Sequence, residues 1–264
     1  MVREVSSISR VGTSEPFDLQ AARGQIAYHN PLFKFGFNPD IDDSLETVWA
    51  EGGLYSYLSA ATVLKVSSSS ANDTSAGTGA RTVELSGLDG DYNEISETVT
   101  LNGQTAVNTT QSFLRIYRMI VKTAGTGAQN AGVIYAGTGT VTTGVPANKY
   151  ATIAIGDNQT LMALWTVPAG YTAYVNQIDI TVATTQNNKY CTGLFLARPF
   201  GEVFQVKDKF VKAESSHHQA YKFPRVFTEK TDIEFRAIGD SAGADIAISA
   251  GIDLIYIKNG NTLA

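Results

Sequence analysis

Three histidines are the first side chains in this sequence whose chemistry could make a site. His217 and His218 are adjacent, and His29 lies far from them in the chain. Neighbouring strand residues point to opposite faces, so the pair is poorly placed to bind one metal ion, and no second His or Cys cluster completes a site. The sequence also lacks a Gly-x-Ser-x-Gly elbow and a catalytic Cys/His signature. We therefore expect no catalytic residues and no enzyme, and the pair predicts a surface or subunit contact.

One acidic loop could bind calcium. Asp89, Asp91 and Asn93 offer oxygen ligands at alternate positions, as calcium loops do. The glycine expected at the sixth place is Glu94, and the twelfth place is Thr100. The Asp-Gly step at 89–90 favours a plain hairpin turn, with calcium as the alternative. The Gly-Thr runs lack the Gly-Lys-Ser/Thr of a phosphate loop, so no cofactor is expected.

Composition and charge exclude several classes of partner. The net charge is -5 over 264 residues, which provides no electrostatic footprint for nucleic acid and disfavours anionic membranes. No apolar run approaches the roughly 20 residues that span a bilayer, and the N-terminus lacks the apolar core of a signal peptide. The single cysteine, Cys191, cannot form an internal disulfide and is expected to be buried. These features predict a protein made in the cytoplasm that binds neither nucleic acid nor membrane.

The elements that must carry these residues are β-strands. Short β-branched and aromatic runs recur between turn residues, with no helical period. Alternation is cleanest at 246–256, whereas within 171–182 the apolar positions change phase at Asn176-Gln177. That change predicts a bulge, or a strand that passes from one sheet to another. Pro168-Ala169-Gly170 predicts a hairpin loop between 161–167 and 171–182. The expected fold class is all-β, with two β-sandwich or jelly-roll-like domains.

Three regions follow from the pattern along the chain. We expect an extended N-terminal arm over residues 1–49, a first β-sandwich domain over 50–145 and a second over 146–264. The boundary between the two domains is placed at the Gly/Thr-rich stretch 137–148. The arm carries closely spaced apolar residues that cannot form a core alone: Tyr28, Leu32, Phe33, Phe35 and Phe37. They need another surface, because exposed apolar area is unfavourable in water. That surface is either the body of this chain or a neighbouring subunit, and both alternatives stay open.

Several stretches together resemble a group of tailed-bacteriophage virion proteins. They are RTVELSGLDGDYNEISETVTLNGQTAVNTT at 81–110, SFLRIYRM at 112–119, LWTVPAGYTAYV at 164–175 and FPRVFTEKTDIEFRA at 223–237. The resemblance covers most of residues 30–258. Its motifs are strand and turn motifs, which identify a structural family and no active site. It implies a β-sandwich virion component and leaves its position on the head, neck or tail open.

The function that this resemblance implies is that of a non-enzymatic structural protein of a bacteriophage particle, assembled in the host cytoplasm and located in the virion. We expect a capsid decoration, or cement, protein that binds the major capsid protein or another virion protein through its arm and forms a homotrimer. The alternative is a neck, baseplate or tail-fibre component that contacts a host glycan through tyrosines such as Tyr92, Tyr150 and Tyr190. A glycan depolymerase fits least, because a parallel β-helix would be longer and more regularly repeated.

Overall fold

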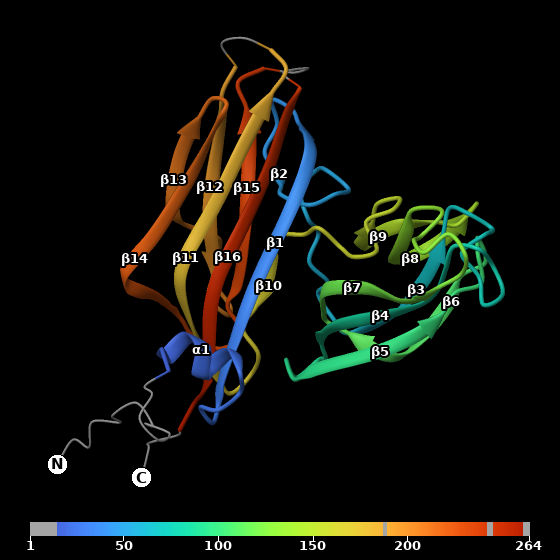
Figure 1. Cartoon of the computed structure of the whole chain (residues 1–264), viewed down its shortest axis with the longest axis horizontal. Coiled ribbons are helices and arrows are strands. Elements are labelled where there is room, and N and C mark those ends of the chain that lie inside the picture. Colours follow the sequence, from blue (N-terminus) through green and yellow to red (C-terminus); the bar gives the residue numbers. More distant parts are fainter. Residues whose placement is uncertain (1–14, 187–188, 242–244, 261–264) are drawn as a thin grey trace.

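The computed structural model describes residues 15–186, 189–241 and 245–260, and it confirms the all-β class. Apart from strands β1 to β16, these residues form one short helix, α1 (Phe17–Ala22). No helix in this part of the chain is long and apolar enough to cross a membrane. Figure 1 shows a tall β-unit, which holds the first and last described strands, beside a smaller one.

The larger unit consists of two antiparallel sheets that share one core. The first sheet has the order β1 (His29–Ile41), β16 (Ile246–Lys258), β11 (Tyr171–Thr184) and β14 (Ser215–Phe227). The second has the order β10 (Leu164–Thr166), β15 (Asp232–Gly239), β12 (Cys191–Arg198) and β13 (Gln205–Lys212), and the short β2 (Glu46–Thr47) also pairs with β15. Ile248 and Ile252 from the first sheet are buried with Phe195 and Phe235 from the second. The core therefore lies between the sheets.

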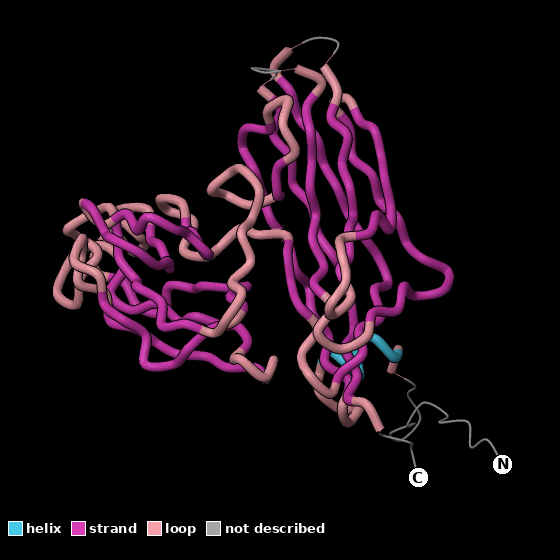
Figure 2. Tube along the Cα trace, turned by 180° about the vertical axis from the view of Figure 1, so that it is seen from behind, coloured by secondary structure: helices cyan, strands magenta, loops and turns pink. Residues whose placement is uncertain are grey.

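The smaller unit also packs two sheets around a core of its own. One sheet has the order β6 (Val107–Phe113), β3 (Thr62–Ser68), β8 (Ile134–Thr142) and β9 (Val145–Ile153). The other has the order β5 (Glu94–Thr100), β4 (Ala80–Leu88) and β7 (Arg115–Ala124). Leu64 and Phe113 are buried here against Leu85 and Met119. Viewed from behind, Figure 2 shows loops passing between the two units.

The predicted boundary between residues 145 and 146 is wrong. The Gly/Thr-rich stretch forms the hairpin of β8 and β9, which pairs Thr142 with Val145 inside one sheet. Thr143 and Gly144 make the turn with positive φ angles of 50° and 81°. The chain leaves the larger unit near Trp49 and returns near Met162, and these two residues form an antiparallel bridge. The smaller unit is therefore an insertion between β2 and β10. The predicted boundary fails because the Gly and Thr residues form a tight turn within this unit and do not form a linker.

Within the described residues, the extended arm predicted for residues 1–49 belongs to the body of this chain, which is one of the two alternatives left open for its packing surface, and it is no separate arm. Residues 17–22 are helical, and residues 29–41 form β1, which pairs with β16 from His29↔Ile257 to Ile41↔Ile246. This strand lies at a sheet edge and places polar Lys34 and Asn38 at buried positions, so its inward face lacks the apolar alternation of a half-buried strand. Residues 1–14 of the predicted arm lie outside the described residues.

The stretch 161–182 differs from its prediction in one respect and agrees in another. It is no hairpin, because β10 pairs with β15 in one sheet while β11 pairs with β16 in the other. Pro168-Ala169-Gly170 instead turns the chain from sheet to sheet, with Gly170 at φ 76°. The phase change is confirmed, since both neighbours of β11 shift register between Val175 and Gln177. The bulge lets residues on both sides of it face the same core.

Candidate functional site

A row of phenylalanines lies on the outer face of the first sheet. Phe33, Phe35 and Phe37 alternate along β1 and lie opposite Asp253, Gly251 and Ser249 of β16. The rings of Phe33 and Phe35 are stacked with centroids 5.5 Å apart. Phe33 is 52% exposed and Phe37 is 36% exposed. Large apolar side chains gathered on an outer face are typical of an interaction surface.

The inward side of β1 keeps this row pointing outward. The Lys34 ammonium, which is buried, donates a hydrogen bond to the carbonyl of Tyr117 in the smaller unit. Burial lowers the pKa of Lys34 well below its ordinary value, and the nearby Arg118 lowers it further. Gly36 lies against backbone, so that a Cβ added to it would be 2.1 Å from the nitrogen of Ala163. These contacts exclude the opposite orientation of the strand.

The five apolar residues predicted to bind a partner are not all on this face. The three phenylalanines are, but Leu32 points inward and packs against the core of the larger unit. Tyr28 is 53% exposed and precedes β1 with φ at 67°. A hollow of about 820 Å³ adjoins the phenylalanine row, and its lining includes Phe17 of α1. The outer face thus extends from β1 to the helix.

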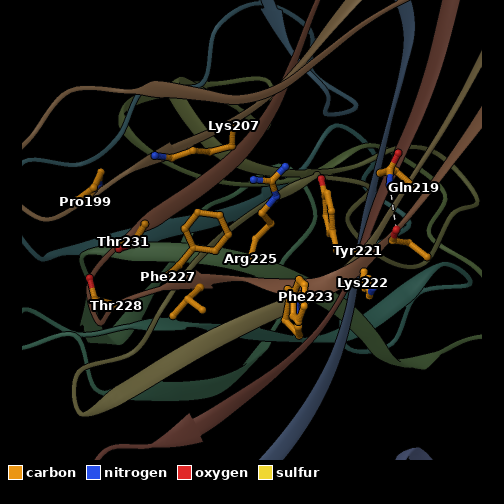
Figure 3. Close-up of a pocket in the computed structure, with 13 residues that line it drawn as sticks. Pro199, Lys207, Gln219, Tyr221, Lys222, Phe223, Arg225, Phe227, Thr228 and Thr231 are labelled. Atoms are coloured by element: carbon orange, nitrogen blue, oxygen red, sulfur yellow. Dashed lines mark hydrogen bonds between the residues drawn. The ribbon is translucent and has the colours of Figure 1, made fainter.

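A second surface, which we call the basic groove, follows β14 at the other edge of the same sheet (Figure 3). It has a volume of about 800 Å³, and its charged lining residues are Lys207, Lys222 and Arg225. None of the three forms an ion pair with the described residues; Arg225 lies 4.8 Å from the ring of Tyr221. Phe223 is 77% exposed beside them. We did not predict this groove, although the Lys-Phe-Pro-Arg run was a signal of an irregular edge strand.

Buried ionic contacts join the two units. Asp232 of β15, 3% exposed, accepts hydrogen bonds from Nε of Arg115 at 2.8 Å and from Nη2 of Arg198 at 2.6 Å. Arg115 belongs to the smaller unit and Arg198 to the larger, so one carboxylate holds both units. Beside it, the buried Glu234 accepts a hydrogen bond from the Tyr57 hydroxyl at 3.1 Å. Burial and then the charge of Glu234 raise the pKa of Tyr57 well above its ordinary value.

A third surface, which we call the cleft, opens above these ion pairs between the two units. Its volume is about 800 Å³. Tyr92 and Phe200 line it with ring centroids 5.8 Å apart, and the Lys230 ammonium lies 5.4 Å and 5.2 Å from the two ring centroids. Tyr92 was one of the tyrosines predicted for glycan contact. Of the other two, Tyr150 is packed against the smaller core and Tyr190 is exposed elsewhere.

The acidic loop is a closed turn in this structure. Asp89 Oδ1 accepts hydrogen bonds from the backbone nitrogens of Asp91 and Asn93, each at 2.9 Å. Although burial alone would raise the pKa of Asp89, the hydrogen bonds from Asn93 and Asp91 lower it. Among the described residues no group of three His, Cys, Asp or Glu side chains is arranged to hold a metal ion. Both carboxylate oxygens of Asp89 accept hydrogen bonds within the turn itself.

The remaining candidates for chemistry are separated in space. His217 stacks on Phe210 at 5.8 Å, whereas His218 contacts the Asp179 carboxylate at 2.5 Å on the opposite face of β14. Cys191 is buried, and that burial raises the pKa of its thiol to about 11. The histidine pair therefore lies on a strand rather than in a loop, with its two rings on different faces.

No family model and no curated protein matches the sequence. Among solved structures, a chain of the infectious bursal disease virus Gx strain is similar at 12% identity and TM-score 0.24, with 89% of this chain and 73% of that chain covered. The VP2 subviral particle of infectious bursal disease virus is similar at 12% identity and TM-score 0.23, with the same coverage of 89% and 73%. Superpositions at these TM-scores do not establish a common fold, and nothing about this chain follows from them.

Proposed function

We propose that this chain is a non-enzymatic structural protein of a bacteriophage particle, a capsid decoration protein located in the virion. The observation that supports this proposal is the exposed row of Phe33, Phe35 and Phe37 on an outer sheet face. The orders β1-β16-β11-β14 and β10-β15-β12-β13 are those of an eight-stranded jelly roll, an architecture used by viral capsid and lectin domains. The row would dock on the major capsid protein or another shell protein, and assembly would take place in the host cytoplasm.

Serine substitutions of the exposed rings test this proposal. Each half-exposed ring contributes about 1 kcal/mol when buried, so Phe33→Ser with Phe37→Ser should weaken capsid binding roughly 30-fold. Point substitutions are needed because deleting residues 29–41 would remove β1 from its sheet. Val211→Ser is the control, since that side chain is 58% exposed on β13 of the second sheet, away from the phenylalanine row and the basic groove. Co-sedimentation with empty phage capsids measures the effect, and wild-type loading by the double variant would contradict the proposal.

We also propose a homotrimer that uses the basic groove. A three-fold ring needs two different, complementary patches on each copy. Lys222 and Arg225 supply the positive patch, and the exposed Asp42 and Asp43 after β1 supply a negative one. Light scattering should give three times 28.2 kDa for the wild type. Lys222→Glu with Arg225→Glu should give monomers, and adding Asp42→Lys with Asp43→Lys should restore trimers; trimers that persist after the first pair would contradict this interface.

The second candidate function is a neck, baseplate or tail-fibre component that recognises a host glycan. The cleft favours it, because pockets between structural units are common ligand sites and this one combines aromatic rings with the Lys230 ammonium, which forms no ion pair with the described residues. A glycan array separates the candidates. Specific binding supports the second function, and a silent array together with capsid binding in many copies supports decoration.

A further inference from the structure

The cleft has walls from both units, and their ion pairs hold it in shape. Arg115 and Leu58 are on the side of the smaller unit, and Arg198 and Asp232 on that of the larger. Nη1 of Arg115 also donates to the carbonyl of Leu58 at 3.0 Å. The backbone nitrogen of Ala169 donates to the carbonyl of Tyr92 at 2.9 Å, a further bond between the units. A ligand would thus meet a preformed surface, which lowers the entropic cost of binding.

Two residues of the cleft hold backbone conformations that favour glycine or asparagine. Tyr92 has φ 67° and Lys230 has φ 61°. Left-handed backbone at bulky residues costs free energy and is concentrated at functional sites. In both cases the conformation belongs to a side chain that lines the cleft, and it brings the Lys230 ammonium near the ring of Phe200, which is 63% exposed. The strain therefore coincides with the aromatic and cationic part of the surface.

The lining of the cleft carries more positive than negative charge, with Arg115, Arg198 and Lys230 against Asp232 and Glu202. Arg115 and Arg198 share Asp232, but Nη1 of Arg198 has no hydrogen-bond partner among the described residues. The Lys230 ammonium forms no hydrogen bond or ion pair with the described residues and lies near the rings of Tyr92 and Phe200. The one other acid of the lining, Glu202, is exposed and accepts a hydrogen bond from Gln205 at 2.7 Å. An anionic group between Lys230 and Arg198 would gain charge-assisted hydrogen bonds.

The aromatic rings favour a particular kind of group attached to that anion. The face of an aromatic ring is electron-rich and attracts positively polarised C–H groups, such as those on one side of a pyranose. Ser59 and Glu202 at the rim can hydrogen-bond to sugar hydroxyls. We propose that the cleft binds a carboxylate-bearing pyranose of an acidic glycan, with the carboxylate on Lys230 and Arg198 and the ring against Phe200. This inference rests on the second candidate function and names its site and ligand class.

Saturation-transfer NMR with monosaccharides tests this site. Glucuronic acid and N-acetylneuraminic acid are the probes, and glucose is the uncharged control. Lys230→Asn removes the charge while keeping a residue that tolerates the left-handed backbone, and Phe200→Ala removes the ring. Each should weaken binding of the acidic sugars by about tenfold or more. Lys209→Asn and Val211→Ala are control variants at exposed positions of β13 outside the cleft and the basic groove, and unchanged melting temperatures would show that all four variants fold.

The results that would exclude this site differ from those that would reject glycan recognition as the function. Acidic sugars that bind equally well to Lys230→Asn, or glucose that binds as well as glucuronic acid, would exclude this site. Array binding to neutral glycans that survives both cleft variants would exclude the cleft but keep the second candidate function. No binding to either acidic sugar, together with a silent array, would reject both.

Discussion

Replacing Asp232 should lower the free energy of unfolding by more than breaking any exposed ion pair among the described residues. The carboxylate of Asp232 is 3% exposed and accepts five hydrogen bonds, among them one from Thr166 at 2.6 Å and two from Arg115 at 2.8 and 3.2 Å. In Asp232→Asn two guanidinium groups lose their common counter-charge. The side chain of Arg198 is 27% exposed and can turn to water, but that of Arg115 is only 8% exposed. The loss is therefore dominated by Arg115.

The size of the loss follows from the burial of that one charge. Breaking a buried ion pair by removing one partner costs about 3–5 kcal/mol, because a charge is left without compensation. For a chain of this size, each kcal/mol lowers the melting temperature by about 2–4 °C, so the shift should be about 6–20 °C. Lys122→Gln is the control, since Lys122 and Glu84 form a 3.5 Å pair whose side chains are 47% and 31% exposed. That change should cost under about 1 kcal/mol.

Calorimetry and urea unfolding followed by tryptophan fluorescence measure both effects. Adding Arg115→Met to Asp232→Asn removes the stranded charge, so the double variant should be more stable than Asp232→Asn alone. If Asp232→Asn cost no more than Lys122→Gln, the carboxylate would not hold the two units together. If the double variant were less stable than the single one, the stranded-charge explanation would be refuted.

Three further predictions concern buried positions. Gly36→Ala should lower the free energy of unfolding by about 1–3 kcal/mol through overpacking. Gly90→Ala should be tolerated, because the nearest atom to its added Cβ would be 3.4 Å away. Equal melting temperatures for the two variants would mean that β1 does not pack as described. Lys34→Met should raise the free energy of unfolding at pH 7, because it removes a buried charge. Since burial depresses the pKa of Lys34 in the folded state, the wild type loses this charge as the pH rises, and the stability gained by Lys34→Met should shrink towards pH 10.5. A gain that grows with pH in urea titrations would contradict this. Cys191, with its thiol pKa raised to about 11, should react with a disulfide reagent at pH 8 only in urea, and rapid labelling of the native protein would contradict its burial.

Local patterns in the sequence predicted local structure well. The alternation at 246–256 is β16, buried on one face from Ile246 to Leu254. The phase change at Asn176-Gln177 is a bulge in β11, because each half of that strand must present its apolar residues to the same core. The outward alternation of Phe33, Phe35 and Phe37 could likewise be read from their spacing. Each of these features depends on residues within a few positions of one another.

Features that depend on distant strands were predicted wrongly or missed. Pro168-Ala169-Gly170 suits a hairpin loop as well as a corner between sheets, and only the pairing of β10 with β15 decides between them. The cleft places Tyr92 beside Phe200 and Lys230, although each of these two residues is more than a hundred positions from Tyr92 in the sequence. No local signal in the sequence indicates the pairing of Arg115 with Asp232, because the two residues lie on strands of different units.

The sequence by itself determined the all-β class, many of the strands, the bulge in β11 and the absence of a composition suited to nucleic acid. Side-chain alternation and turn residues encode these properties within short windows. The tertiary structure alone decided which sheet each strand joins, the insertion of the smaller unit between β2 and β10, and the incorporation of β1 as an edge strand rather than an arm. Those outcomes depend on which apolar faces, far apart in the chain, bury one another with their backbone groups paired, and no local window contains that information.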